Sequence, residues 1–153
     1  GREERRGERA NPVVTLAEVP FQEFRAYDLR VFPSARDAFL QAWIAMPHGR
    51  CLGWLEGGQL RGYGGIRACR QGFKVGPLFA DDPAIAEALY GELCRDLPVG
   101  AEVYLDAPET NPAALALTER HGMRTVFETA RMYTQAPPLN QECVYGITTF
   151  ELG

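Results

Sequence analysis

The sequence lacks the features that mark several specialised classes of protein. No stretch approaches the ~20 apolar residues that a membrane-spanning helix needs, and no basic and hydrophobic leader resembling a signal peptide opens the chain. Only two histidines are present, and no Cys, His and acidic side chains cluster at metal-ligand spacing. These absences argue against a membrane partner, a secreted location and a bound metal.

Cysteine and clustered basic charge are also sparse. The four cysteines are scattered without a C-x-x-C pair, so free thiols in a reducing cytoplasm are the expected state, with disulfide pairing left open. The formal net charge is −4, whereas contacts to nucleic acid need clustered Lys and Arg. We therefore expect a cytoplasmic protein whose main partner is not nucleic acid.

The chain opens with a polar segment. Residues 2–9 carry basic and acidic side chains whose charges nearly cancel, which is typical of a solvated tail or interdomain linker. The first residue is not methionine, so we expect a processed, shortened or domain-cut product. We place a disordered tail or interdomain linker over residues 1–12 and one domain over residues 13–153.

The apolar pattern after Pro12 predicts strands and helices in a mixed order. We expect a strand at 13–16, helices from 20 and over 35–46, strands at 51–56, 59–70 and 73–80, a helix from 83 to about 95, a strand at 101–106, a helix from 112 to 122, and strands near 125–134 and 144–152. The order β-α-α-β-β-β-α-β-α-β-β favours an α/β (α+β) fold. Its mixed central sheet would have about seven strands and helices on both faces.

Gly76-Pro77 interrupts the predicted strand at 73–80. Proline cannot complete a ladder, so the pair indicates a bulge. The helix that follows demands a crossover, so the strands at 73–80 and 101–106 should be parallel neighbours. We expect these two strands to diverge towards Leu78 and Asp106.

The helix predicted after Asn111 carries a spaced motif. Asn111, Ala114 and Thr118 are followed by Gly122-Met123 at the intervals of N-x-x-A-x-x-x-Y-x-x-x-G-[FM]. By local chemistry alone, Asn111 is a helix cap and Gly122 a helix stop. Together with the element order, the spacing resembles the GNAT (GCN5-related N-acetyltransferase) superfamily, so we expect the GNAT fold.

The resemblance implies an acyl-CoA-dependent N-acyltransferase that moves an acetyl group from acetyl-CoA, or another acyl group from its CoA ester, directly to an amine. Asn111 and Ala114 would lie against the pantetheine arm, with the asparagine binding it. Backbone N–H groups at Leu78 and Phe79 would polarise the thioester carbonyl, with Ala80 beside them in the cofactor site. No metal takes part in this reaction.

The stretch 81–86 corresponds to the diphosphate loop of the family, Q/R-x-x-G-x-G/A. Ala84, Ile85 and Ala86 would offer backbone N–H groups at a helix N-terminus. Asp81 replaces the family's basic residue, and Asp82-Pro83 is typical of an ordinary helix cap followed by proline. Two carboxylates beside a diphosphate predict weak CoA binding.

Three residues are candidates for the catalytic roles. Asp106 and Glu109 lie past the end of a predicted parallel strand, where α/β folds bind ligands; either one, Asp106 through a water, would deprotonate the amine, although solvated loop carboxylates are the commoner case. Thr118 stands at the position of the tyrosine that protonates the CoA thiolate. Because threonine is a poorer acid, that role is vacant or filled elsewhere. For His121 a cap or surface position is favoured over catalysis.

Several strand residues lend themselves to two interpretations. Tyr63, Arg67 and residues 131–133 would line the acceptor cleft or serve packing and the surface. The acceptor itself would be a small-molecule or peptide amine.

Four short stretches sharpen the resemblance. Residues 76–81, 105–111, 130–133 and 150–153 are similar to the C-terminal domain of bacterial two-domain GNAT proteins of the YitH type. That similarity implies a preceding GNAT domain in a longer chain, with a homodimer left open. The alternative is a catalytically silent GNAT-like domain that binds a ligand or completes a pocket for its partner.

Overall fold

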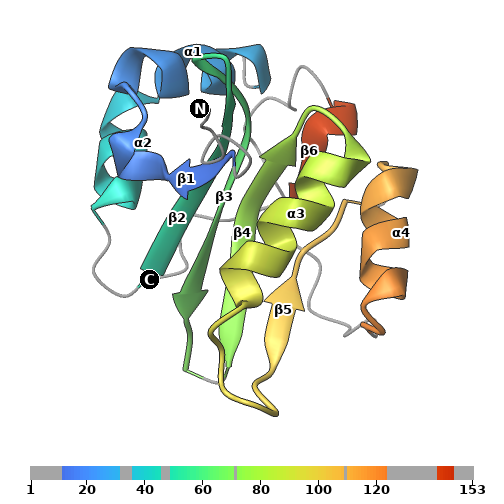
Figure 1. Cartoon of the computed structure of the whole chain (residues 1–153). Helices are drawn as coiled ribbons and strands as arrows, with labels where there is room; N and C mark the ends of the chain where they lie inside the picture. Colours follow the sequence, from blue (N-terminus) through green and yellow to red (C-terminus); the bar gives the residue numbers. More distant parts are fainter. Residues whose placement is uncertain are drawn as a thin grey trace, which may run out of the picture.

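The helices and strands follow one another in the predicted order wherever the structure describes the chain (Figure 1). The computed structural model describes residues 12–31, 36–45, 49–70, 72–108, 110–123 and 141–146. The strands are β1 (Val13–Thr15), β2 (Gly49–Glu56), β3 (Gln59–Ala68), β4 (Phe73–Ala80), β5 (Val103–Leu105) and β6 (Val144–Gly146). The helices are α1 (Phe21–Val31), α2 (Asp37–Ile44), α3 (Pro83–Cys94) and α4 (Pro112–Arg120), with 3₁₀ turns at Leu16–Glu18 and Gln141–Cys143.

Three predicted features fall wholly or partly outside the described residues. The tail or linker over residues 1–12 is described only at Pro12, and β1 begins one residue later. The strand expected near 125–134 is not among the described residues, and the last expected strand is described from Val144 to Gly146.

One mixed sheet runs through the described part of the chain. Its strand order is β1-β2-β3-β4-β5, with β6 beside β4. Strands β1 to β4 are antiparallel neighbours, whereas β4 and β5 are parallel, as predicted. The β2–β3 hairpin turns at Gly57 and Gly58, whose φ angles of 59° and 80° glycine adopts without steric cost.

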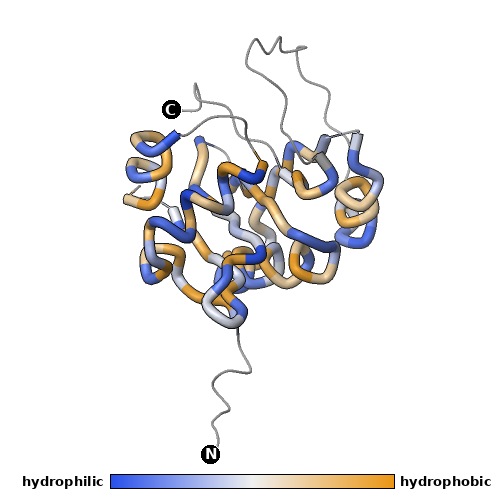
Figure 2. Tube along the Cα trace, turned by 90° about the horizontal axis from the view of Figure 1, so that it is seen from above, coloured by the Kyte–Doolittle hydropathy of each residue, from blue (hydrophilic) through white to orange (hydrophobic). Residues whose placement is uncertain are grey.

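Helices cover both faces of the sheet, as predicted (Figure 1). On one face, α1 and α2 pack with Tyr63 and Phe79. On the other, α3 and α4 pack with Val75 and Leu78. Strand β4 contributes to both cores because its side chains point alternately to the two faces. Figure 2 shows hydrophobic and hydrophilic residues alternating along the helices, as expected where each helix buries one side.

Local sequence sets where α3 and α4 begin. The Asp82 side chain accepts a hydrogen bond from the Ile85 N–H at 2.9 Å, and the Asn111 side chain accepts one from the Ala113 N–H at 3.1 Å. A proline follows each cap at a position that needs no N–H donor. Gly122, with φ of 68°, follows the end of α4. The expected caps and stop are confirmed.

The bulge predicted at Gly76-Pro77 is present and divides β4 in two. Val75 lies opposite Ile66 of β3, and Leu78 lies opposite Gly64. Two residues of β4 therefore face one residue of β3, which defines a bulge.

Strands β4 and β5 pair only before this bulge. The three pairs are Phe73 with Val103, Lys74 with Tyr104, and Val75 with Leu105. Strand β4 continues to Ala80, whereas β5 ends at Leu105. The predicted divergence towards Leu78 and Asp106 is therefore confirmed.

Candidate functional site

The point where β4 parts from β5 brings several predicted site residues to one sheet edge. Leu78, Phe79 and Ala80 lie in β4 beyond the bulge and are buried. Asp106 directly follows β5 and is half-buried. Helix α3 starts three residues after β4 ends, so its N-terminus lies at the same end of the sheet.

Strand β6 runs antiparallel along β4 at this point. Leu78 lies opposite Gly146, and Phe79 lies opposite Val144. Strand β3 occupies the other edge of β4, so β6 takes the edge on which β5 pairs before the bulge. A strand of the chain itself thus covers the edge that the family resemblance assigns to a bound cofactor.

Gly146 allows β6 to fit closely between its neighbours. A Cβ atom at Gly146 would lie 2.7 Å from Leu105 Cδ1 and 3.2 Å from Leu78 Cβ. The first distance is shorter than packed carbon atoms tolerate. A larger residue at this position would therefore have to displace the end of the Leu105 side chain and would crowd Leu78.

Asn111 joins α4 to the segment that carries β6. Its Nδ2 atom donates to the carbonyl oxygens of Glu142, at 3.1 Å, and Val144, at 2.9 Å. Its Oδ1 atom accepts the cap hydrogen bond from Ala113. The residue is 3% exposed, and both amide donors are used within the chain. Its neighbour on the next turn, Ala114, is fully buried.

The first turn of α3 uses most of its own N–H groups. Pro83 has none, and the Ile85 N–H donates to the Asp82 carboxylate. The Ala86 N–H donates to the Asp82 carbonyl oxygen at 3.2 Å. Of the residues predicted to hold a diphosphate, only the exposed Ala84 adds an N–H that these contacts leave unused.

Asp81 is held by side chains from α1 and β3. Tyr27 donates its hydroxyl to Asp81 at 3.2 Å, and Arg61 pairs with the same carboxylate at 3.4 Å. The Arg30 guanidinium lies 4.6 Å from the Tyr27 ring centre. Burial, reinforced by the Asp81 charge, raises the pKa of Tyr27 far above its usual value, so it stays a donor. Sequence reasoning missed this cluster because its members are distant in the chain.

Of the other two catalytic candidates, Thr118 lies on α4 and Glu109 lies outside the described residues. The Thr118 hydroxyl donates to the Leu115 carbonyl oxygen at 2.7 Å, within its own helix. At a rise of ~1.5 Å per residue, Thr118 is roughly 10 Å along α4 from Asn111. Glu109 is not among the described residues.

His121 belongs to a surface network between α3 and α4. Its Nε2 atom contacts the Glu87 carboxylate, and its ring lies 4.6 Å from the ring of Tyr90. Arg120 donates to the same carboxylate at 2.7 and 3.0 Å. Burial tends to raise the pKa of Glu87, but the hydrogen bonds from Arg120 and His121 outweigh it and lower that pKa. A surface position is what the sequence favoured for His121.

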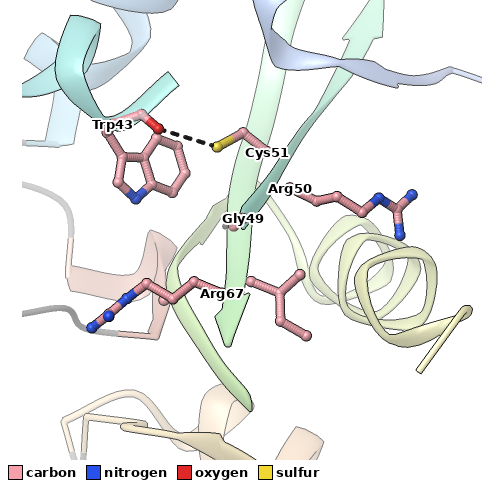
Figure 3. A pocket seen from close by; sticks show the side chains of 8 residues that line it. Trp43, Gly49, Arg50, Cys51 and Arg67 are labelled. Atoms are coloured by element: carbon pink, nitrogen blue, oxygen red, sulfur yellow. Dashed lines mark hydrogen bonds between the residues drawn. The ribbon is translucent and has the colours of Figure 1, made fainter. Parts of the chain in front are cut away.

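A pocket opens beside the bulge, on the face of the sheet that α2 covers (Figure 3). It is shallow, with room for about one water molecule, and its lining includes Trp43, Gly65, Arg67 and Gly76. Of the strand residues predicted to line an acceptor cleft, Arg67 does line this pocket. Tyr63 is instead fully buried in the core, and residues 131–133 lie outside the described part of the chain.

The described thiols and acidic residues offer neither a reactive thiolate beside the opening nor a metal site. All four cysteines are free. Burial raises the pKa of Cys143, next to β6, to about 11, and that of Cys51 to about 12. Both therefore stay protonated at neutral pH. Over the described ranges, no three Cys, His, Asp or Glu side chains group as metal ligands, and no helix is long and apolar enough to cross a bilayer.

Comparison with known proteins identifies one family. A family model described as an acetyltransferase (GNAT) domain matches residues 24–146. The chain is 27% identical over 130 residues to a holothin acyltransferase of Pseudoalteromonas sp., an alignment that covers 83% of this chain and 44% of that protein.

Two solved structures show the same fold. A putative acetyltransferase from Pyrococcus horikoshii has a TM-score of 0.60 and 23% identity, over 92% of this chain and 46% of that one. An aminoglycoside 6'-N-acetyltransferase from Acinetobacter baumannii has a TM-score of 0.58 and 13% identity, over 81% of this chain and 97% of that one. The chain spans less than half the length of the Pseudoalteromonas and Pyrococcus proteins.

Proposed function

Since the chain belongs to the GNAT acetyltransferase domain family, we propose that it works in an acyl-CoA-dependent N-acyltransferase that acetylates an amine. The likeness to a holothin acyltransferase makes acyl transfer the reaction to test first. We assign the activity to the complete gene product, because the chain spans less than half the length of that relative. In that product we place a second GNAT domain before this one.

The observation that carries this proposal is the separation of β4 from β5 at the Gly76-Pro77 bulge. Parallel strands that part do so at their carboxyl ends, which is where α/β folds bind ligands. The N-terminus of α3 lies at the same end, and its partial positive charge suits a diphosphate. This layout favours a thioester of CoA as the donor.

Direct transfer suits the chemistry better than a covalent acyl-enzyme. The Cys143 thiol stays protonated at neutral pH because burial raises its pKa to about 11, and a thiol is a weak nucleophile. In direct transfer, the amine nitrogen attacks the thioester carbonyl and loses a proton, the C–S bond breaks, and the CoA sulfur gains a proton. The residues that move these protons stay predictions: Asp106 or Glu109 for the amine, and Thr118 for the CoA sulfur. They can act only if this domain holds the donor.

The test is an acyl-transfer assay on the complete gene product. Acetyl-CoA is offered with a panel of small-molecule amines and peptides, and both free CoA and the acetylated amine are measured by mass spectrometry. We expect amine-dependent release of CoA, one acetylated amine per CoA released, and no acetylated protein. Hydrolysis of acetyl-CoA without an acetylated amine, or no release with any amine, would overturn the proposal.

A further inference from the structure

We propose that this domain fills its own acyl-donor site with β6 and Asp82, and that the donor of the reaction is held by another GNAT domain. The inference rests on the acyltransferase function proposed above. A donor site of this layout needs an open edge of β4 for the pantetheine arm. It also needs unused N–H groups at the start of α3 for the diphosphate. Strand β6 takes up the edge of β4, and at the start of α3 only the Ala84 N–H is left unused.

Strand β6 stands in for the arm. It pairs with Leu78 and Phe79 on the edge of β4 that the bulge releases from β5. Its residues Val144 and Tyr145 are 4% and 2% exposed, and they belong to the cores on opposite faces of the sheet. Because β6 fills both cores, an arm could not pair with β4 without uncovering apolar side chains on each face.

Asn111 holds β6 in place through two side-chain hydrogen bonds. A pantetheine arm would need the Asn111 amide as a partner, but both N–H groups of that amide already serve Glu142 and Val144. The side chain is buried, so these bonds are shielded from water and their loss would leave polar groups unsatisfied. Asn111 is therefore a positioning residue for β6 in this chain.

Asp82 stands in for the diphosphate. Its carboxylate takes the N–H group of Ile85, Pro83 contributes none, and the Ala86 N–H makes the first hydrogen bond of the helix itself, to the Asp82 carbonyl oxygen. A carboxylate at this position meets the positive end of the helix as an anionic ligand would. The adjacent Asp81 is shared between Tyr27 and Arg61, so the start of α3 is already matched to negative charge from the chain.

The first test is an NMR titration of the 153-residue chain with acetyl-CoA. We expect the amide signals of Leu78, Phe79 and Ala84 to stay unchanged up to about 1 mM, the weak limit of ordinary cosubstrate affinities. The amides of β6 should stay protected from hydrogen exchange throughout. Saturable shifts at Leu78 and Phe79 at micromolar acetyl-CoA would overturn the inference.

The second test separates the two roles of the Asn111 side chain, which holds β6 in place and caps α4. Asn111→Asp keeps an oxygen for the Ala113 N–H but removes both donors to Glu142 and Val144. We expect amide exchange to accelerate over residues 142–146 by at least about tenfold, while the first turn of α4 stays protected. Glu119→Gln, on the exposed side of α4, is the matched control and should change neither. Unchanged amide exchange of β6 in Asn111→Asp would contradict the role of Asn111 in holding β6 in place.

The two proposals fail in different ways. If the complete gene product acetylates amines while this chain binds acetyl-CoA at β4, the function stands and the filled site is wrong. If the chain ignores acetyl-CoA and the complete gene product transfers no acyl group, the filled site stands and the function is wrong.

Discussion

Asp28 shows at the residue scale how this domain buries a charge. The residue is 1% exposed and lies on α1, facing Arg36 at the start of α2 and Tyr63 of β3. Arg36 donates two hydrogen bonds to its carboxylate, at 2.7 and 2.9 Å, and the Tyr63 hydroxyl donates a third at 2.6 Å. A carboxylate out of water is stable only with such partners, so each partner should matter.

Removing Asp28 should destabilise the fold strongly. Asp28→Ala leaves the Arg36 cation and the Tyr63 hydroxyl without their acceptor, and we expect the free energy of unfolding to fall by ~3–5 kcal/mol in urea titrations. Tyr63→Phe removes one hydrogen bond to a charge and should cost about 1.5–3 kcal/mol. Asp37→Ala is the control, because the Arg25–Asp37 pair is 43% and 47% exposed; we expect less than ~1 kcal/mol. Equal losses at Asp28 and Asp37 would refute this assignment.

The buried thiols predict a loss of stability in alkaline solution. Burial raises the pKa of Cys143 to about 11, whereas an unfolded thiol titrates near ~8.5. The unfolded chain therefore loses its proton first, so stability is full below about pH 8.5 and declines towards pH 11. Cys143→Ala should flatten the fall of the melting temperature between pH 8 and 10.5. An unchanged pH profile in this variant would show that folding does not raise the pKa of the half-buried Cys143 thiol.

At the element scale, glycine governs how closely α2 approaches the sheet. A Cβ atom on Gly65 of β3 would lie 2.8 Å from Cη2 of Trp43, and closer still to Cζ2 of the same indole. Gly91 in α3 differs, because a Cβ there would meet nothing within 4 Å. The two glycines therefore form a matched pair, one required by packing and one not.

Substitution of the two glycines should have opposite effects. Gly65→Ala forces Trp43 and α2 outwards, which we expect to lower the free energy of unfolding by ~1–3 kcal/mol. Gly91→Ala replaces a poor helix former in the interior of α3 and should raise it by about 0.5–1 kcal/mol. Chemical unfolding of both variants checks the prediction. Stabilisation by Gly65→Ala would mean that α2 does not pack on β3 in this way.

Local chemistry explains which elements could be predicted from the sequence. The starts of α3 and α4 follow from Asp82-Pro83 and Asn111-Pro112, since a cap acts on N–H groups two or three residues away. The divergence of β4 and β5 follows from Gly76-Pro77, because proline cannot donate to a ladder. These features are decided within a few neighbouring residues.

Long-range pairing explains what the sequence could not reveal. Nothing in the short run Val144–Gly146 tells which strand edge it joins, and β4 is far away in the chain. The cap role of Asn111 was readable, but its two donated hydrogen bonds depend on where β6 lies. The same holds for Asp81, whose partners come from α1 and β3.

At the scale of the whole molecule, the chain has a GNAT fold, and we infer that its donor-binding features are occupied from within. The family model covers residues 24–146, and β4 parts from β5 at the Gly76-Pro77 bulge. The opening nevertheless holds β6, and the start of α3 holds Asp82. We therefore expect this domain to support acyl transfer in the complete gene product without binding the donor itself.

Calorimetric titration of acetyl-CoA into the 153-residue chain tests this claim most directly. Two effects act against binding: β6 would have to leave β4, and the carboxylates of Asp81 and Asp82 would repel the diphosphate. We predict a dissociation constant weaker than about 1 mM, equivalent to ~4.1 kcal/mol of binding free energy or less. A one-to-one complex with low-micromolar affinity would contradict the account and make this domain an ordinary acyl-CoA site.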